Sequence, residues 1–251
     1  ENKIFNLPQK LQYRIDIFDE FSLDERSKLL RFALLNKDIK EYLISYFGFT
    51  PRIHRVEVLY NKPNPYLKEE GSKSWHRDLD CDFKNIKLFL PISQSNEMNG
   101  PFFYLKDKSF VSRFVALEEN DNEDVWIRGR VSNALINKLE TNIDSFLSMK
   151  HGSSLLIDTV NIYHKGGYCK SENRIILHIS FQGNGWTSTK PQNLMEEIQY
   201  LINNTDNFLE KIIFKNELKK YINYLNRLFI TKLLSKFIYK ISNFFIIKIQ
   251  S

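Results

Sequence analysis

Hydrophobic side chains recur at helical spacing near the start of the chain. The segment SLDERSKLLRFALL places apolar residues three and four positions apart, and Ser22 followed by Glu25 matches the capping box that begins many helices. The segment IKEYLISYFGF continues this spacing and stops near Gly48 and Pro51. The opening of the chain is therefore predicted to be helical.

After Pro51 the spacing changes to an alternation of apolar and polar residues, which is typical of strands. The alternating segments are RIHRVEVLY, NIKLFLPI, PFFYL, SSLLIDTV and NRIILHISF. No helical pattern follows each of them, so we expect an antiparallel sandwich or barrel rather than a parallel α/β sheet. Residues 111–148 are expected to be an insertion or crossing segment of mixed and partly helical character, because they contain VSNALINKLETNIDSFL.

The helical pattern returns from residue 191, and residues 218–251 contain no acidic side chain. Lysines recur every fourth residue along one stripe of this segment, at Lys232, Lys236 and Lys240. Leu, Ile and Phe fill the opposite side, so we expect a basic amphipathic helix, or two in series. We expect residues 1–190 to form a β-rich domain with N-terminal helices and residues 191–251 a basic helical C-terminal extension.

Composition places the chain among globular proteins, with 42% hydrophobic and 26% charged residues in 251. The net charge of +6 lies entirely in residues 206–251, which hold nine Lys or Arg and three acids. Two cysteines form no disulfide framework and no Cys-x-x-Cys pair. With no signal-peptide pattern and no run of about 18 apolar residues, we expect a cytoplasmic protein, with peripheral contact at a membrane surface as a second expectation.

Three roles stay open for the basic C-terminal helix. It can pack its apolar side on the barrel, lie on an anionic membrane surface, or form a dimer. Nucleic-acid binding is not expected, because the rest of the chain is neutral and shows no binding module. The oligomeric state is left open.

Two residues of the stretch SWHRD suggest metal chemistry. On a strand, residues two apart point to the same side, so His76 and Asp78 would aim an imidazole and a carboxylate at one spot. His164 follows the apolar segment SLLIDTV and is the best candidate for a third ligand. Two histidines and one carboxylate leave further positions open on a metal, as non-haem Fe(II) oxygenases require.

An arginine follows the second histidine at a suggestive distance. Arg174 lies ten residues beyond His164, on a strand where it shares one face with Ile176, His178 and Ser180. An inward guanidinium there could grip a carboxylate with two hydrogen bonds, which favours a dicarboxylate cosubstrate. His178 could line the same pocket or be a hydrogen-bonded core histidine.

The order WHRD, then NGPFFYL, then His-x₉-Arg resembles the phytanoyl-CoA dioxygenase family of Fe(II)/2-oxoglutarate-dependent oxygenases. The resemblance implies a double-stranded β-helix (jelly-roll, cupin-like) core. It implies metal ligands at His76, Asp78 and His164, and a 2-oxoglutarate-binding arginine at Arg174. It also implies that Lys87 lines the cosubstrate pocket. The segment LKDKSF departs from the family pattern by carrying Phe110 where a histidine is common.

The resemblance further implies the reaction class. Fe(II), 2-oxoglutarate and O₂ would hydroxylate an aliphatic carbon of a small organic or lipid-linked substrate, and the presence of Asp78 favours hydroxylation over halogenation. Two other classes stay open. One is a non-catalytic cupin-like protein that binds a metal or ligand, and the other is a membrane-surface scaffold that acts through its basic C-terminal helix.

Other polar and aromatic residues near these motifs are expected to be structural. His54 and His151 flank strands and are expected at the surface or as capping residues. Trp75 is expected to point away from the metal and pack. Cys81 and Cys169 are expected to be structural thiols.

Overall fold

The computed structural model describes residues 14–63, 71–78, 84–93, 95–106, 130–131, 136, 143–146, 153–183 and 192–249. Within these ranges, side chains are not described for residues 71, 130, 228 and 230–249. The predictions for Cys81, Phe110 and His151 lie outside the described residues, as does most of the predicted insertion at 111–148.

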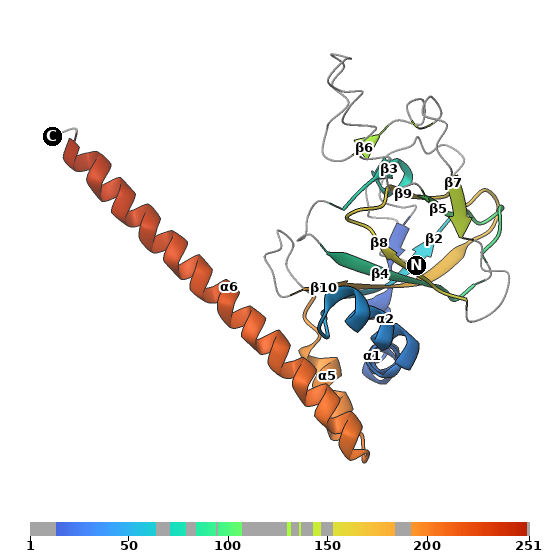
Figure 1. The fold of residues 1–251 in the computed structure, drawn as a ribbon, viewed down its shortest axis with the longest axis horizontal. Helices are drawn as coiled ribbons and strands as arrows, with labels where there is room; N and C mark the ends of the chain where they lie inside the picture. Colours follow the sequence, from blue (N-terminus) through green and yellow to red (C-terminus); the bar gives the residue numbers. More distant parts are fainter. Residues whose placement is uncertain are drawn as a thin grey trace.

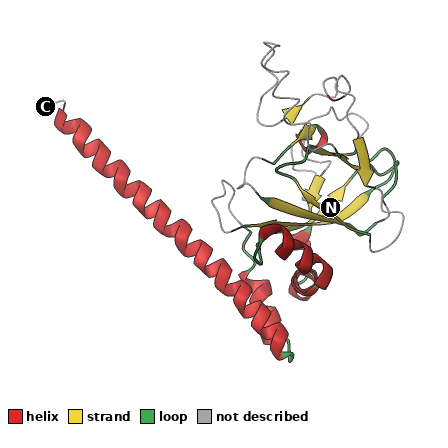
Figure 2. Cartoon of the chain, viewed as in Figure 1, coloured by secondary structure: helices red, strands yellow, loops and turns green. Residues whose placement is uncertain are grey.

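Two antiparallel five-stranded sheets make up the described β-structure (Figures 1 and 2). The first contains, in spatial order, β1 (Arg14–Asp16), β2 (Arg52–Asn61), β10 (Arg174–Gln182), β4 (Asn85–Pro91) and β8 (Leu155–Asp158). The second contains β6 (Arg130–Val131), β3 (Trp75–His76), β9 (His164–Gly166), β5 (Phe102–Leu105) and β7 (Ile143–Phe146). From β2 to β5 and from β8 to β10 the chain alternates between the sheets, which is the winding of the predicted double-stranded β-helix.

Four helices and two short 3₁₀ turns accompany the described sheets. They are α1 (Leu23–Leu35), α2 (Lys37–Phe47), α5 (Met195–Asn203), α6 (Phe208–Ile249), η2 (Phe18–Glu20) and η3 (Gly71–Lys73). The predicted capping box is confirmed, because the Ser22 side chain accepts from the Glu25 backbone N–H and the Glu25 side chain accepts in return. Gly48 ends α2 in the left-handed conformation, with φ of 79°.

The first sheet is apolar on one face and polar on the other. Along β10, Leu177 and Ile179 belong to the hydrophobic core, whereas His178 and Ser180 point to the opposite side, and all four are buried. The helices cover the apolar face, as Figures 1 and 2 show. The second sheet lies over the polar face, so the polar side chains of β10 are enclosed between the sheets.

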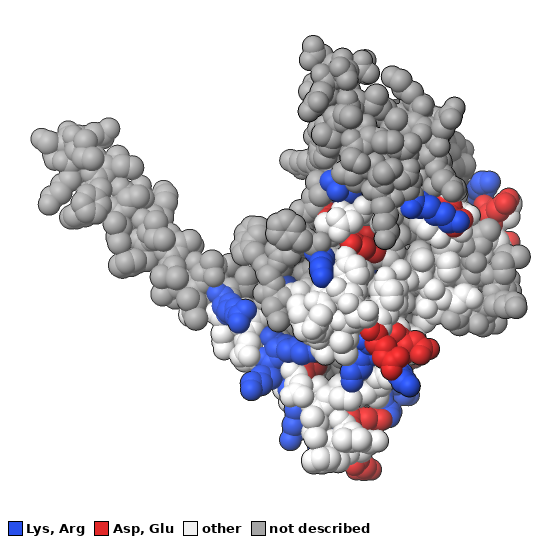
Figure 3. Space-filling view, in the orientation of Figure 1, with Lys and Arg blue, Asp and Glu red and all other residues white. Residues whose placement is uncertain are grey.

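The C-terminal helices begin as part of the same core. Leu194, Ile198 and Phe214 belong to one cluster with the helices and the first sheet. Beyond the buried Tyr224, α6 runs away from the sheets (Figure 1), and Phe229 is 66% exposed. Basic side chains lie along α6 where it leaves the body (Figure 3). The division into 1–190 and 191–251 stays a prediction, but the two parts share a hydrophobic core.

No helix of the described chain is long and apolar enough to cross a membrane.

Residues 143–146 correct the prediction of partly helical structure in the inserted segment. They form β7, which pairs with β5 by placing Ile143 opposite Leu105, and the Tyr104 hydroxyl donates to Asp144. Pairing with a distant strand thus overrode the local helical pattern.

A close backbone approach fixes the turn Asn99-Gly100-Pro101 beside the end of β9. Gly100 has φ of 80°, and a Cβ atom there would collide with the backbone of Tyr168 and Gly167. The Gly167 N–H donates to the Pro101 carbonyl at 2.6 Å. Only glycine fits this position, because both the left-handed conformation and the missing side chain are needed.

We expect Gly100→Ala to destabilise the fold much more than Gly48→Ala. Both positions have φ near 80°, so the backbone strain of about 1–2 kcal/mol is common to both variants. At Gly48 no atom lies within 4 Å of an added Cβ, so the difference reports the collision at Gly100. Urea unfolding should show at least about 2 kcal/mol more loss for Gly100→Ala. Equal losses would contradict this account.

Candidate metal centre

Two histidines face each other across neighbouring strands of the second sheet. His76 on β3 is the direct antiparallel partner of His164 on β9. Their ring centroids lie 4.3 Å apart. Residues that are directly opposite in an antiparallel pair project to the same face, so pairing of strands far apart in the sequence brings the two imidazoles together.

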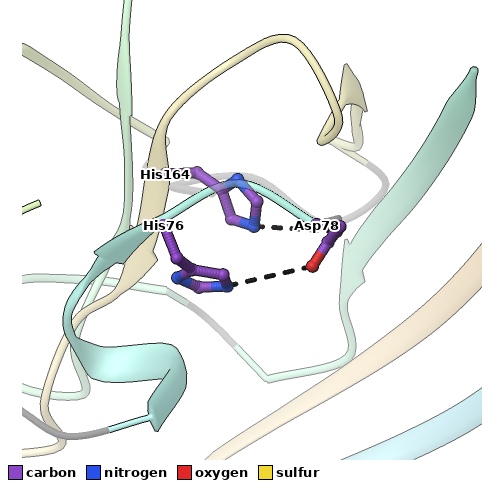
Figure 4. Close-up of side chains that lie close together, drawn as sticks. All are labelled: His76, Asp78 and His164. Atoms are coloured by element: carbon purple, nitrogen blue, oxygen red, sulfur yellow. Dashed lines mark ion pairs between the residues drawn. The ribbon is translucent and has the colours of Figure 1, made fainter. Parts of the chain in front are cut away.

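The backbone sets which ring nitrogen of each histidine faces inward. His76 Nδ1 lies 2.8 Å from the Ser74 carbonyl, and His164 Nδ1 lies 3.0 Å from the Ile162 carbonyl. A carbonyl only accepts, so each Nδ1 carries the proton and each Nε2 is unprotonated and has a lone pair. Both Nε2 atoms point towards Asp78 (Figure 4).

Asp78 completes the group from the loop just after β3. Its backbone N–H donates to the Thr159 carbonyl at 2.8 Å, which holds this loop against the end of β8. Asp78 Oδ1 lies 4.0 Å from His76 Nε2, and Oδ2 lies 4.0 Å from His164 Nε2. The predicted regular strand through Asp78 is wrong, because β3 ends at His76. The side chain nevertheless points to the predicted side.

A lysine from the facing sheet holds the carboxylate. Lys87 on β4 places Nζ 2.7 Å from Asp78 Oδ2. Burial by itself would raise the pKa of Asp78, but the Lys87 ammonium outweighs it and holds that pKa well below its usual range. Asp78 is therefore ionised. The predicted role of Lys87 in binding a cosubstrate stays a prediction, and its observed contact is with the carboxylate.

The three side chains fit a divalent metal. Burial, and then the neighbouring His76, lower the pKa of His164 to about 3, so this imidazole is neutral as a ligand must be. One ligand atom from each residue lies within 4.8 Å of the others, and in the described part of the chain this is the group that could hold a metal ion. Two imidazole nitrogens and one carboxylate are the donor set of a facial triad.

Arg174 lies in the same cavity as the triad, at the start of β10. This cavity has a volume of about 140 Å³ and is lined by both. The Arg174 side chain is buried, and neither Nε nor Nη1 has a hydrogen-bond partner among the described residues. A buried guanidinium without an acid is costly, so the arrangement favours an anionic ligand at this end.

Lys73 is a second cation at this end, and the sequence reasoning missed it. It is the last residue of η3, two positions before β3 begins, and it is buried and lines the cavity. Its ammonium donates to the Gly167 carbonyl, next to the Gly100 turn. Burial, and then the charge of Arg174, lower the pKa of Lys73 to about 7. The only feature of the sequence that could have indicated this role is the position of Lys73 three residues before His76. A lysine exposed to solvent could occupy the same position, so the sequence does not distinguish the two cases.

His178 combines the two roles that the sequence left open. Its Nδ1 lies 2.6 Å from Glu57 Oε2, and its ring lines the cavity beside Phe89. Burial lowers the pKa of His178, with the Glu57 carboxylate opposing, so the ring is neutral and Nδ1 donates to the carboxylate. Phe89 also contacts Phe102, whose ring stacks on His164, so aromatic rings line the space from His178 to the triad.

Three further predictions have an outcome in the described structure. Trp75 points away from the triad as expected, and packs in a second core cluster with Val131 and Tyr163. Cys169 is buried and contacts the Asn99 carbonyl, as a structural thiol would. The surface position expected for His54 is wrong, because this side chain is only 4% exposed.

Comparisons with known proteins give similarity at the level of structure alone. A scan against protein-family models finds no match, and a search of curated proteins finds no significant one. The structure is similar to those of the epimerase SnoN in complex with Fe³⁺, alpha ketoglutarate and nogalamycin RO (12% identity, TM-score 0.45) and of HygX from Streptomyces hygroscopicus with nickel and 2-oxoglutarate (12%, 0.44). It is also similar to EctD from S. alaskensis with bound Fe (14%, 0.45).

The similarity covers part of each chain. It covers 68% of this chain and 63% of SnoN, 70% and 72% for HygX, and 71% and 59% for EctD. This chain therefore spans less than two thirds of the length of SnoN. At such identities and TM-scores, the function has to be argued from the site itself.

We expect Asp78→Asn to weaken Fe(II) binding by at least about 100-fold, because it removes a charged ligand and leaves two neutral imidazoles. Anaerobic calorimetric titration of metal-free protein with Fe(II) measures this. The matched control is Asp144→Asn, which removes a carboxylate that pairs with Lys106 outside the triad. Unchanged affinity in Asp78→Asn would exclude Asp78 as a ligand.

Proposed function

We propose that the protein is an Fe(II)- and 2-oxoglutarate-dependent dioxygenase that hydroxylates an aliphatic carbon of a small organic molecule. One observation carries this proposal: a facial triad and a buried arginine that has no acid partner among the described residues line one cavity between two sheets. The motif order WHRD, NGPFFYL and His-x₉-Arg supports a place near the phytanoyl-CoA dioxygenase family.

Each part of the cavity has a defined task in this proposal. His76, Asp78 and His164 would hold the metal through two Nε2 atoms and a carboxylate oxygen. Lys87 keeps the Asp78 carboxylate oriented, because their ion pair spans the two sheets. Arg174 binds the distal carboxylate of 2-oxoglutarate, and Lys73 adds a second positive charge beside it.

Bound Fe(II) would supply the open positions at which 2-oxoglutarate and O₂ react. In the net reaction, 2-oxoglutarate loses CO₂ and takes up one oxygen atom to become succinate. The second oxygen atom enters a substrate C–H bond as a hydroxyl group. The protein contributes an apolar wall beside this chemistry, because Phe89 and Phe102 line the cavity next to the histidines.

A non-catalytic cupin-like binding protein is the rival proposal. Such a protein would use the same metal ligands but would form no succinate. The buried Arg174 favours the enzyme, since a metal-binding protein without a dicarboxylate has no need of an internal guanidinium whose Nε and Nη1 lack partners in the described part of the chain. Three further possibilities are separate proposals: peripheral membrane contact through residues 218–251, self-association, and a lipid-linked substrate. The exposed Phe229 beside a basic stretch of α6 is the feature that motivates the first of them.

We expect Fe(II) and 2-oxoglutarate together to give a weak visible charge-transfer band under anaerobic conditions. His76→Ala should abolish the band, because it removes a ligand. Arg174→Met should keep the band but require about 10- to 100-fold more 2-oxoglutarate, since a charge-assisted hydrogen bond is lost. Arg31→Met is the matched control, because Arg31 pairs with Glu210 on the helical surface. A folded, iron-loaded wild type without a band would contradict the proposal.

The affinity for 2-oxoglutarate should fall as the pH rises above 7. Lys73 has its pKa lowered to about 7, first by burial and then by Arg174, so its ammonium loses its proton above this pH in the free protein. A bound carboxylate favours the protonated form, so binding is tightest on the acid side of 7. Titrations at saturating metal from pH 6.5 to 8.5 should show up to roughly tenfold weakening in wild type.

Lys73→Met is the control for this pH dependence. It should bind 2-oxoglutarate more weakly than wild type at pH 6.5, and its affinity should change little with pH. An equal pH slope in wild type and Lys73→Met would assign the dependence to another group.

A further inference from the structure

The enclosed space continues past the triad towards the other end of β10. An adjoining cavity of about 160 Å³ shares Arg14, Lys87 and His178 with the cavity that holds Arg174. We call this second cavity the polar subsite. The residues that line it include His54, Arg55, Asn85, His178, Ser180 and Gln182. Arg174 begins β10 and Gln182 ends it, so the proposed cosubstrate anchor and the polar subsite lie at opposite ends of one strand.

A β-bulge supplies two neighbouring residues to the polar subsite. In the pairing of β2 with β10, Ser180 is opposite Arg55 and Phe181 is opposite Ile53. The pairing register passes from Arg55 to Ile53, which makes His54 the extra residue of the bulge. His54 and Arg55 therefore both line the subsite, while Ile53 returns to the hydrophobic core. A regular strand would have turned His54 towards the core side with Val56.

The subsite presents two buried hydrogen-bond acceptors. Because His178 Nδ1 donates to Glu57, its Nε2 is an acceptor, and it has no partner among the described residues. Asn85 Nδ2 donates to the Thr159 hydroxyl at 3.3 Å, and Asn85 Oδ1 likewise has no partner there. Both side chains are buried. Buried acceptors require donors, so a ligand with hydroxyl or amine groups would satisfy them.

The charge at the rim of the subsite is positive. One carboxylate, Glu57, contacts His178 at 2.6 Å, Arg14 at 3.4 Å and Arg55 at 3.6 Å. Two guanidinium groups thus share one acid, and the Arg55 side chain is 43% exposed at the opening. A half-neutralised arginine pair at a partly open rim favours an anionic group on the ligand.

We propose that the polar subsite binds the primary substrate, and that this substrate is a small hydroxylated or aminated molecule with an anionic group. The inference rests on the proposed function, because it takes the Arg174 end of the space to be occupied by 2-oxoglutarate. The donors of the substrate bind His178 and Asn85, and its anionic group binds Arg55. This places the substrate next to Lys87 and the triad, on the side away from Arg174.

The test measures succinate formation by the full chain loaded with Fe(II) and 2-oxoglutarate. The probes are hydroxylated anions (glycerol 3-phosphate, gluconate and phosphoserine), glycerol alone, inorganic phosphate alone, octanoate, and phosphatidylglycerol vesicles. We expect each hydroxylated anion to raise the rate of succinate formation at least severalfold above the rate with glycerol, phosphate, octanoate or vesicles. A larger response to octanoate or vesicles would overturn the proposal. A rate of succinate formation that none of the probes changes would overturn it as well.

Two variants address the subsite separately from the metal centre. Arg55→Met should reduce the stimulation by hydroxylated anions about tenfold, whereas Arg31→Met should leave it as in wild type. Ser180→Val fills the buried end of the subsite without changing charge and should also reduce the stimulation. Each variant is compared with its own probe-free rate, and the charge-transfer band reports whether its cosubstrate site is intact.

A binding measurement separates failure of this inference from failure of the proposed function. Thermal unfolding of the metal-free protein is followed with glycerol 3-phosphate, glycerol or phosphate. A rise in Tm with glycerol 3-phosphate alone, lost in Arg55→Met and Ser180→Val, would support the subsite even if no charge-transfer band forms. A band with no selective stabilisation and no selective stimulation would keep the oxygenase and overturn the subsite.

Discussion

Burial of charged groups between two sheets is the constraint on which the rest of this structure depends. Asp78 and Lys87 form an ion pair across the space between the sheets, and His178 and Glu57 form another polar pair beside it. Burying charge is unfavourable, and partners compensate for it only in part. The apolar face of the same sheet offsets this cost by packing against α1, α2, α5 and the start of α6. The helices are therefore needed for the site, although none of them contributes a ligand to it.

Strand β10 orders the chemistry along one line. Arg174, His178 and Gln182 are four residues apart on its inner face, and four strand residues span roughly 13 Å. The positively charged end, the neutral histidine beside the triad and the polar subsite thus follow each other at fixed spacing. The facing sheet adds His76 and His164 to the middle of this line. A rigid strand in the centre of a sheet can hold these groups in place better than a loop could.

Much of the fold follows from local patterns. The capping box at Ser22, the stop at Gly48 and five alternating segments all correspond to observed elements. The short strands β1, β6 and β9 were not predicted, because two or three residues carry too little pattern. The strand β7 was taken for part of a helical segment, because its identity depends on pairing with β5.

The sequence by itself determined the residue types and spacings of the metal centre. A His-x-Asp pair followed by His-x₉-Arg supplies two imidazoles and a carboxylate for a metal and a guanidinium for an anionic ligand. It also determined that one face of β10 is apolar and the other polar. Only the tertiary structure decided that Lys87 contacts Asp78, that Lys73 lies buried with Arg174, and that His54 turns inward. The physical reason is that cross-sheet contacts, burial and a one-residue shift in strand register are properties of the packed chain. A lysine or histidine that is solvated and one that is enclosed by two sheets look the same in a sequence.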